Sequence, residues 1–227
     1  MYARVRRPGV LCRTLVPVLM DELVARVDDL RCSLHPRVLI GIAGPPGAGK
    51  STLAEMLVAR LQAEGWPTAH VPMDGFHLAD AALDRLGLRG RKGAPETFDA
   101  DGYAALLARV TGGEPVWAPA FERTLEQPIA QSIEVGEDIE VVVSEGNYLL
   151  IPEQPWRHAR ELFDEVWFCA CHDEVRRERL LKRHIEFGKT PDEARAWVDR
   201  VDEPNATLVN ASAYLADLDL DMDELGL

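Results

Sequence analysis

A single glycine-rich stretch limits the folds open to this chain more than any other feature of its 227 residues. The stretch consists of Gly44, Pro45, Pro46, Gly47, Ala48, Gly49, Lys50 and Ser51, and Thr52 follows it directly. It matches the pattern G-x-x-x-x-G-K-[ST] at every fixed position. Such glycines let backbone N–H groups point at phosphate oxygens, and a helix that begins there offers its positive end to the same anion. We therefore predict a nucleotide phosphate site, with Lys50 on the β- and γ-phosphates and the Ser51 hydroxyl on Mg²⁺.

The segments around this loop predict an α/β fold. Residues 37–43 form a short apolar run typical of a buried parallel strand, and residues 52–61 carry apolar residues at helical spacing. Similar patterns predict strands at 68–73, 139–144 and 165–170, and helices at 80–86, 99–110, 155–163 and 173–187. Strands that alternate with helices favour a mainly parallel sheet with helices on both faces. With the glycine-rich loop, this pattern predicts the three-layer fold of P-loop NTPases.

We also predict three additions to this core and one domain boundary. The additions are a small β insertion formed by a hairpin at 116–121 and 129–135, a helical lid at about 173–203, and an edge strand at 217–223. Residues 37–227 are expected to form one domain. Residues 1–36 are expected to form an N-terminal extension with an amphipathic helix near 18–30, because leucine and valine recur there at helical spacing.

The charge balance argues against a general nucleic-acid binder. The chain has 25 basic and 38 acidic residues and a formal net charge of −13, whereas phosphate backbones favour Lys and Arg. No apolar run approaches the roughly 20 residues that a membrane-spanning helix needs, so we expect no membrane partner. The four cysteines do not make a disulfide framework in a chain of this length, which favours a reducing, cytoplasmic location.

Two carboxylates follow predicted strands, at the edge of the sheet where ligands of open α/β sheets bind. Asp74 lies in the segment MDGFH after the strand at 68–73, and Glu145 follows the strand at 139–144. A carboxylate beside a bound alcohol can accept the hydroxyl proton, and one beside the phosphates can bind Mg²⁺ directly or through water. We predict the first role for Asp74 and the second for Glu145. The alternatives are a turn-forming Asp before glycine, and an N-cap or turn carboxylate.

The helix predicted at the start of the lid has a basic face and an apolar face. Arg176, Arg179 and Arg183 lie on the first, and Val175, Leu181 and Ile185 lie on the second. We expect the apolar face to pack against the protein. Guanidinium groups form bidentate bonds with phosphates, so we expect Arg179 and Arg183 to close over the γ-phosphate. The alternative is a charged face that contacts only solvent.

Several of these segments together resemble a known superfamily. They are the glycine-rich loop, the MDGFH segment, RKGAPETFD at 91–99 and EGNY at 145–148. In this combination the chain, from about residue 37 to its end, resembles the superfamily of uridine kinase, phosphoribulokinase and bacterial pantothenate kinase. It is most similar to a nucleoside/nucleotide-kinase-like branch, some members of which are labelled fructose transport system kinases. The resemblance implies that Asp74 is the catalytic base and that Arg91 and Lys92 contact the phosphate acceptor.

The resemblance also suggests further acceptor contacts. Relatives carry a tyrosine-rich strand where this chain has PAFER at 119–123, and Phe121 replaces the tyrosine. Arg123 is a candidate contact for an acidic or polyhydroxylated acceptor, or else part of a surface ion pair. His77 is a candidate acceptor contact, or else a structural hydrogen-bonding residue. Asn205, near the start of a late helix, is a candidate for the substrate or nucleotide side.

Together these features predict an ATP- and Mg²⁺-dependent kinase. Its partner would be a small molecule with a hydroxyl group, such as a sugar, a nucleoside or a pantothenate-like alcohol. The alternative is a nucleotide-responsive regulatory P-loop ATPase, or a catalytically inactive nucleotide-binding module. A GTPase is not expected, because the chain has no Asn-Lys-x-Asp motif. The resemblance also makes a homodimer one of the assemblies to expect.

Overall fold

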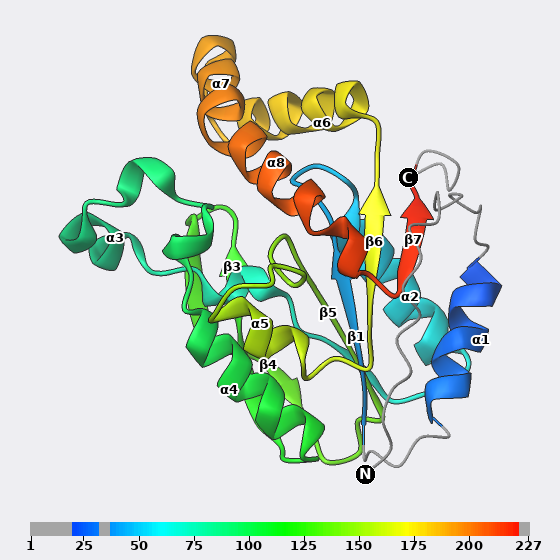
Figure 1. The fold of residues 1–227 in the computed structure, drawn as a ribbon. Coiled ribbons are helices and arrows are strands. Elements are labelled where there is room, and N and C mark those ends of the chain that lie inside the picture. The colour runs from blue at the N-terminus through cyan, green and yellow to red at the C-terminus, as the bar shows by residue number, and fades with distance from the viewer. Residues whose placement is uncertain (1–19, 32–36, 223–227) are drawn as a thin grey trace.

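A five-stranded parallel sheet forms the centre of the protein (Figure 1). The computed structural model describes residues 20–31 and 37–222, and the strand order within this part is β2-β5-β1-β6-β7. The strands are β1 Val38–Ala43, β2 Thr68–His70, β5 Val141–Gly146, β6 Glu165–Ala170 and β7 Leu218–Asp221. The central strand β1 pairs with β5 and with β6, so the loop that follows β1 leaves the sheet between the ends of two neighbouring strands.

Helices cover both faces of this sheet. Helices α1 (Met20–Arg31) and α2 (Lys50–Ala63) pack on one face, together with the side chains of β1, β5 and β6 that point to that side. Helices α4 (Ala100–Thr111), α5 (Trp156–Arg160) and α8 (Glu203–Ala211) pack on the other face. The predicted three-layer α/β fold is therefore confirmed. Among the described residues, no helix is long and apolar enough to cross a membrane.

The second strand is shorter than its sequence pattern predicts. Strand β2 ends at His70, and residues Met73–Phe76 form a 3₁₀ turn, η1, instead of continuing the strand. Pro72 precedes this turn, and its ring removes the backbone donor that a strand would need there. Asp74 therefore lies in a turn beyond the end of β2.

A hairpin and a short helix extend the side of the molecule next to this turn. The hairpin consists of β3 (Val116–Glu122) and β4 (Gln127–Val135), with a bulge between Ala118 and Ala120. It is the predicted β insertion, and it packs against η1. Helix α3 (Asp80–Leu86) projects from the body of the molecule, and two 3₁₀ turns, η2 (Arg89–Arg91) and η3 (Pro95–Thr97), lead from it to α4 (Figure 1).

The lid segment lies beyond the carboxyl ends of the strands (Figure 1). It contains α6 (Asp173–Glu186), α7 (Pro191–Trp197) and a π-helical turn (Val198–Asp202) that leads directly into α8. The expected packing of α6 is wrong. Its fully buried residues are Arg176 and Leu180, because the side of the helix that carries them faces the glycine-rich loop. Ile185, which was expected to pack against the protein, is 43% exposed.

Candidate active site

The glycine-rich loop connects β1 to α2, as predicted, and its glycines adopt conformations that other residues rarely adopt. Gly47 has φ 81° and Gly49 has φ 90°, both in the left-handed region. A Cβ atom on Gly47 would lie 2.8 Å from the backbone oxygen of Arg176, so the loop also needs glycine for its close contact with the lid. The backbone turn leaves Lys50 as the first residue of α2, at the positive end of that helix.

Lys50 and Glu145 form the buried charged centre of the site. The Lys50 ammonium donates to the backbone oxygen of Pro45 at 3.1 Å. Burial lowers the pKa of Lys50, and the nearby Glu145 carboxylate opposes this shift, whereas Arg183 adds to it. Burial and the charge of Asp74 raise the pKa of Glu145, Lys50 acts against both, and the net result is a pKa of about 6. Two opposite charges are therefore buried close to the glycine-rich loop, which is called the phosphate loop below. A bound anion would stabilise the charge of Lys50, and a bound cation would stabilise that of Glu145.

The Ser51 hydroxyl and the Glu145 carboxylate are placed to share one ligand. Ser51 Oγ donates to Glu145 Oε1 at 2.9 Å, and Glu145 is buried at the end of β5. Hydroxyl and carboxylate oxygens suit Mg²⁺, which commonly takes only one or two protein ligands besides phosphate and water oxygens. Within the described residues there is no cluster of three or more His, Cys, Asp or Glu side chains that could hold a metal ion by itself. The two oxygens therefore fit a metal that arrives together with a nucleotide.

Asp74 lies across the cavity from the phosphate loop, in the η1 turn. The turn is held close to the hairpin, since a Cβ atom on Gly75 would lie only 2.2 Å from the backbone oxygen of Pro119. Asp74 Oδ2 is 3.9 Å from Arg123 Nη2, and both side chains line the same cavity. A carboxylate with a single, loosely held cation beside it keeps oxygen lone pairs available for the proton of a ligand.

One cavity of about 310 Å³ joins these groups. The predicted site residues that line it are Pro46, Gly47, Lys50, Ser51, Asp74, His77, Lys92, Arg123, Glu145, Arg183 and Asn205. One side of the cavity is formed by the phosphate loop, Glu145 and the lid, and the other by η1, the start of α3, the residues from η2 to η3, and the hairpin. These are called the nucleotide side and the acceptor side below, after the function proposed for them. The predicted residues that do not line it are Gly44, Pro45, Ala48, Gly49, Thr52, Arg91 and Arg179.

The two predicted pairs of basic residues are divided by the fold. Lys92 lines the cavity, whereas the Arg91 side chain is 66% exposed and lies 2.7 Å from Glu96. Arg183 also lines the cavity. Arg179 lies beside the loop instead, with Nη1 3.8 Å from Cys171 Sγ.

Asn205 and His77 line the cavity and also make structural contacts. Asn205 Nδ2 donates to the backbone oxygen of Gly93 at 3.1 Å, and the Tyr148 hydroxyl donates to the same oxygen. His77 Nδ1 is 2.8 Å from the backbone oxygen of Asp74. Both side chains therefore help to shape the acceptor side of the cavity.

Several cavity residues were not identified from the sequence. Asp80 pairs with Lys92 at 2.8 Å, and His184 Nε2 lies 2.8 Å from Asp202 Oδ2 inside the lid. Trp197, with Lys189 Nζ 4.9 Å from its ring centre, also lines the cavity. No motif spacing marks these residues. The only available signal was that Asp80 begins a predicted helix close to the MDGFH segment.

The chain is similar to known kinases over most of its length. The model of the "Phosphoribulokinase / Uridine kinase family" matches residues 39–193. The Schizosaccharomyces pombe protein named "Putative uridine kinase C227.14" is 35% identical over 214 residues, covering 87% of this chain and 88% of that protein. A pantothenate kinase of Halalkalibacterium halodurans is 30% identical over 154 residues, but these cover only 48% of that enzyme.

A solved structure is similar to this chain in both fold and sequence. It is the crystal structure of a "putative fructose transport system kinase" from Silicibacter sp. TM1040, which superposes with a TM-score of 0.81 at 36% identity. The match covers 89% of this chain and 98% of that chain. The family match, the Schizosaccharomyces pombe protein and this structure agree with the glycine-rich loop and the α/β fold described above. The chain therefore belongs to the phosphoribulokinase/uridine kinase family of P-loop kinases.

Proposed function

We propose that this protein transfers the γ-phosphoryl group of ATP to a hydroxyl group of a small metabolite. The observation that carries the proposal is the cavity that joins Lys50, Ser51 and Glu145 on one side to Asp74 on the other. A phosphate site alone would suit many nucleotide-binding proteins. A second carboxylate across the same cavity is what a kinase needs to accept the proton of an alcohol.

The nucleotide side would hold ATP through groups that are already in place. The loop N–H groups and the start of α2 favour the phosphate anions, and Lys50 adds a full positive charge. Ser51 and Glu145 are the residues that would hold Mg²⁺. When bound, this ion supplies positive charge that offsets the charge of the β- and γ-phosphate oxygens. Arg183 would supply a further cation from the lid, close to Lys50.

On the acceptor side, Asp74 would orient the hydroxyl group for attack. The acceptor oxygen forms a bond to the γ-phosphorus while the bond from that phosphorus to the β–γ bridging oxygen breaks. The hydroxyl proton passes to the Asp74 carboxylate, and ADP leaves with the bonding electron pair. Closure of the lid around the cavity would exclude water and so limit hydrolysis of ATP.

The proposal is tested by measuring ADP release from the purified protein with ATP, Mg²⁺ and a panel of small alcohols that includes sugars, nucleosides and pantothenate-like compounds. We expect release that depends on one class of alcohol. Asp74→Asn should lower this turnover about 10²-fold or more while nucleotide binding, measured by calorimetry, stays close to that of the wild type. ATP hydrolysis that no alcohol accelerates would support a regulatory ATPase and contradict the proposal.

A further inference from the structure

The acceptor side of the cavity contains three cations, and each of them lies next to a carboxylate. Lys92 Nζ is 2.8 Å from one oxygen of Asp80, and Arg89 Nη2 is 2.7 Å from the other. Arg123 Nη2 is 3.9 Å from Asp74. A single carboxylate, Asp80, therefore lies next to two of the cations, and the group proposed as the catalytic base lies beside the third.

The pair of Lys92 and Asp80 is part of the framework of the site. The side chains are 11% and 21% exposed, so both are largely removed from solvent. Lys92 also donates to the backbone oxygen of Glu126, and the Asp80 N–H donates to the side chain of Gln127 at 3.1 Å. The tip of the hairpin thus holds both partners. A pair fixed in this way is harder for a ligand to separate than an exposed surface pair.

Besides Lys50 in the phosphate loop, two further cations line the cavity, and both belong to the lid. The charge of Arg183 reaches Lys50, which places it towards the phosphate loop. Lys189 lies over the ring of Trp197, another lid residue. Neither comes from the segments that surround Lys92. The acceptor side itself therefore offers charges of both signs, and its three cations, Arg89, Lys92 and Arg123, are balanced by three carboxylates, Asp74, Asp80 and Glu126.

Such an arrangement discriminates between acceptor classes. A carboxylate or phosphate on the acceptor would meet Asp74 and Asp80, and it could gain Lys92 only by leaving Asp80 partly buried and unpaired. A hydroxyl group avoids this cost, because it can donate to a carboxylate oxygen and accept from an ammonium group at the same time. Paired side chains thus remain good partners for alcohols and poor partners for anions.

An aromatic wall adds an apolar surface next to these pairs. The ring of His77 packs against Phe98, with 3.9 Å between ring centres, and against Phe121, with 4.8 Å between ring centres. His77 Nδ1 must carry a hydrogen, because its neighbour at 2.8 Å is the backbone oxygen of Asp74, which can only accept. Burial lowers the pKa of His77, so its ring is neutral and Nε2 is an acceptor. Apolar faces and neutral hydrogen-bonding groups suit the C–H and O–H surfaces of a polyol.

From these contacts we infer that the acceptor is an uncharged, polyhydroxylated molecule such as a sugar, a sugar alcohol or the ribose of a nucleoside, and that Asp80 selects against acids. The inference rests on the proposed kinase function and narrows it. It separates this site from one built for hydroxy acids or sugar phosphates, where an unpaired Lys or Arg would be expected on the acceptor side.

The test compares acceptors that share one carbon skeleton. ADP release is measured with a neutral sugar, with the corresponding sugar acid and with its phosphate ester, and the same sets are run for sugar alcohols and nucleosides. We expect kcat/KM for the neutral member of the productive set to exceed that of each charged member by about tenfold or more. A charged member preferred by the wild type would overturn the inference and leave the kinase function standing. No release with any compound would contradict the kinase function itself, and the inference with it.

A variant adds a second test of the role of Asp80. Asp80→Asn removes the charge that offsets Lys92 and Arg89, so it should shift the ratio of kcat/KM values towards the charged acceptor by about tenfold. Asp84→Asn is the matched control: Asp84 lies 3.3 Å from Arg89, is largely exposed and does not line the cavity. Its ratio should equal that of the wild type. Equal ratios in all three proteins would contradict the role of Asp80, and the wild-type comparison applies whether or not the Asp80 variant folds.

Discussion

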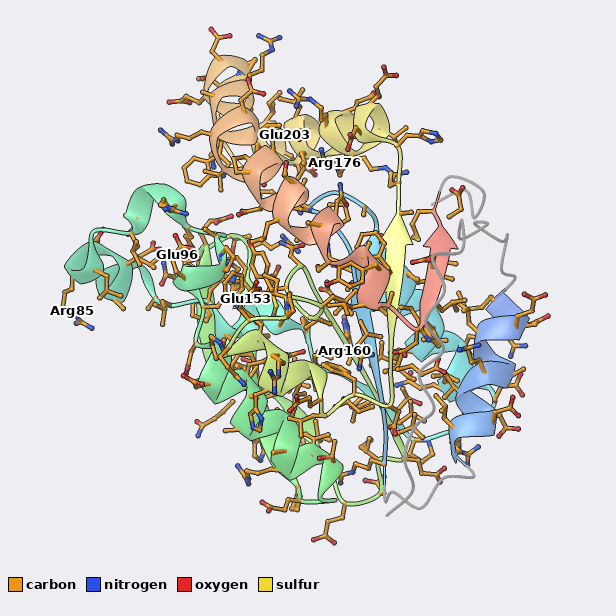
Figure 2. The ribbon with its side chains drawn as sticks, viewed as in Figure 1. Arg85, Glu96, Glu153, Arg160, Arg176 and Glu203 are labelled. Carbon is orange, nitrogen blue, oxygen red and sulfur yellow. The ribbon has the colours of Figure 1, made fainter. Side chains whose placement is uncertain are left out.

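The guanidinium group of Arg176 lies 2.6 Å from the carboxylate of Glu203 and connects the base of α6 to the start of α8 (Figure 2). Arg176 is 1% exposed, and it also contacts Asp173 at 3.1 Å and the backbone oxygen of Pro46 at 3.5 Å. The same side chain therefore joins the two ends of the lid to the phosphate loop. The lid is anchored at its base, so closure would involve its outer part.

Replacement of Arg176 by methionine should destabilise the protein. Arg176→Met keeps an apolar side chain of similar length but removes the buried guanidinium group and its bonds to Glu203 and the loop, and a hydrogen bond to a charged group typically contributes about 1.5–3 kcal/mol. We expect the free energy of unfolding, measured in urea, to fall by about that amount. Arg177→Met is the control, because Arg177 also lies near Glu203, at 3.0 Å, but is 41% exposed and should contribute less than about 1 kcal/mol. Equal losses in the two variants would contradict the anchoring role.

The two lid arginines should differ in their effect on catalysis. Arg183 lines the cavity, whereas Arg179 lies beside the loop next to Cys171. Removal of a group that stabilises charge in the transition state typically costs about 10²-fold in kcat, so we expect this loss for Arg183→Ala. The loss for Arg179→Ala should be at least tenfold smaller. Steady-state kinetics of the two variants would decide this, and similar losses in kcat would show that both arginines reach the reacting phosphate.

The requirement for Mg²⁺ should depend on pH through Glu145. Its pKa is raised to about 6, so the carboxylate is ionised above this pH and protonated below it. A protonated carboxyl group is a poor metal ligand. The Mg²⁺ concentration that gives half-maximal turnover should therefore rise as the pH falls through 6, by about tenfold per pH unit below it. Glu145→Gln is the control for protonation of the nucleotide itself. At pH 8 this variant should need more Mg²⁺ than the wild type, and below pH 6 it should lack the additional rise in Mg²⁺ requirement that the wild type shows.

A methyl group at Gly75 should disturb the position of Asp74. The Cβ atom of Gly75→Ala would lie 2.2 Å from the backbone oxygen of Pro119, so the turn or the hairpin would have to move. We expect a loss of about 1–3 kcal/mol in the free energy of unfolding, together with lower turnover. Gly90→Ala is a suitable control, because its Cβ atom would have no neighbour within 4 Å. Unchanged stability and turnover in Gly75→Ala would show that the hairpin does not position Asp74.

The phosphate loop could be predicted because all of its requirements lie within consecutive residues. Glycines that accept φ near 80–90°, a lysine at the start of a helix and a hydroxyl group after it are properties of the local chain. The alternation of strands and helices is equally local, and it predicted the parallel sheet and the hairpin. Even so, β2 ended early, because Pro72 and the close approach of Pro119 to Gly75 act together on one turn.

Which of two similar residues lines the cavity depended on contacts between distant parts of the chain. Lys92 rather than Arg91 lines the cavity because Asp80 and the hairpin tip hold it there, and Arg183 rather than Arg179 lines it because of how α6 packs over the loop. Arg176 became a buried anchor through Glu203, 27 residues away. A residue's neighbours in sequence fix its backbone conformation, but the charge and exposure of its surroundings are decided only when separate segments pack together, and these surroundings give each side chain its role.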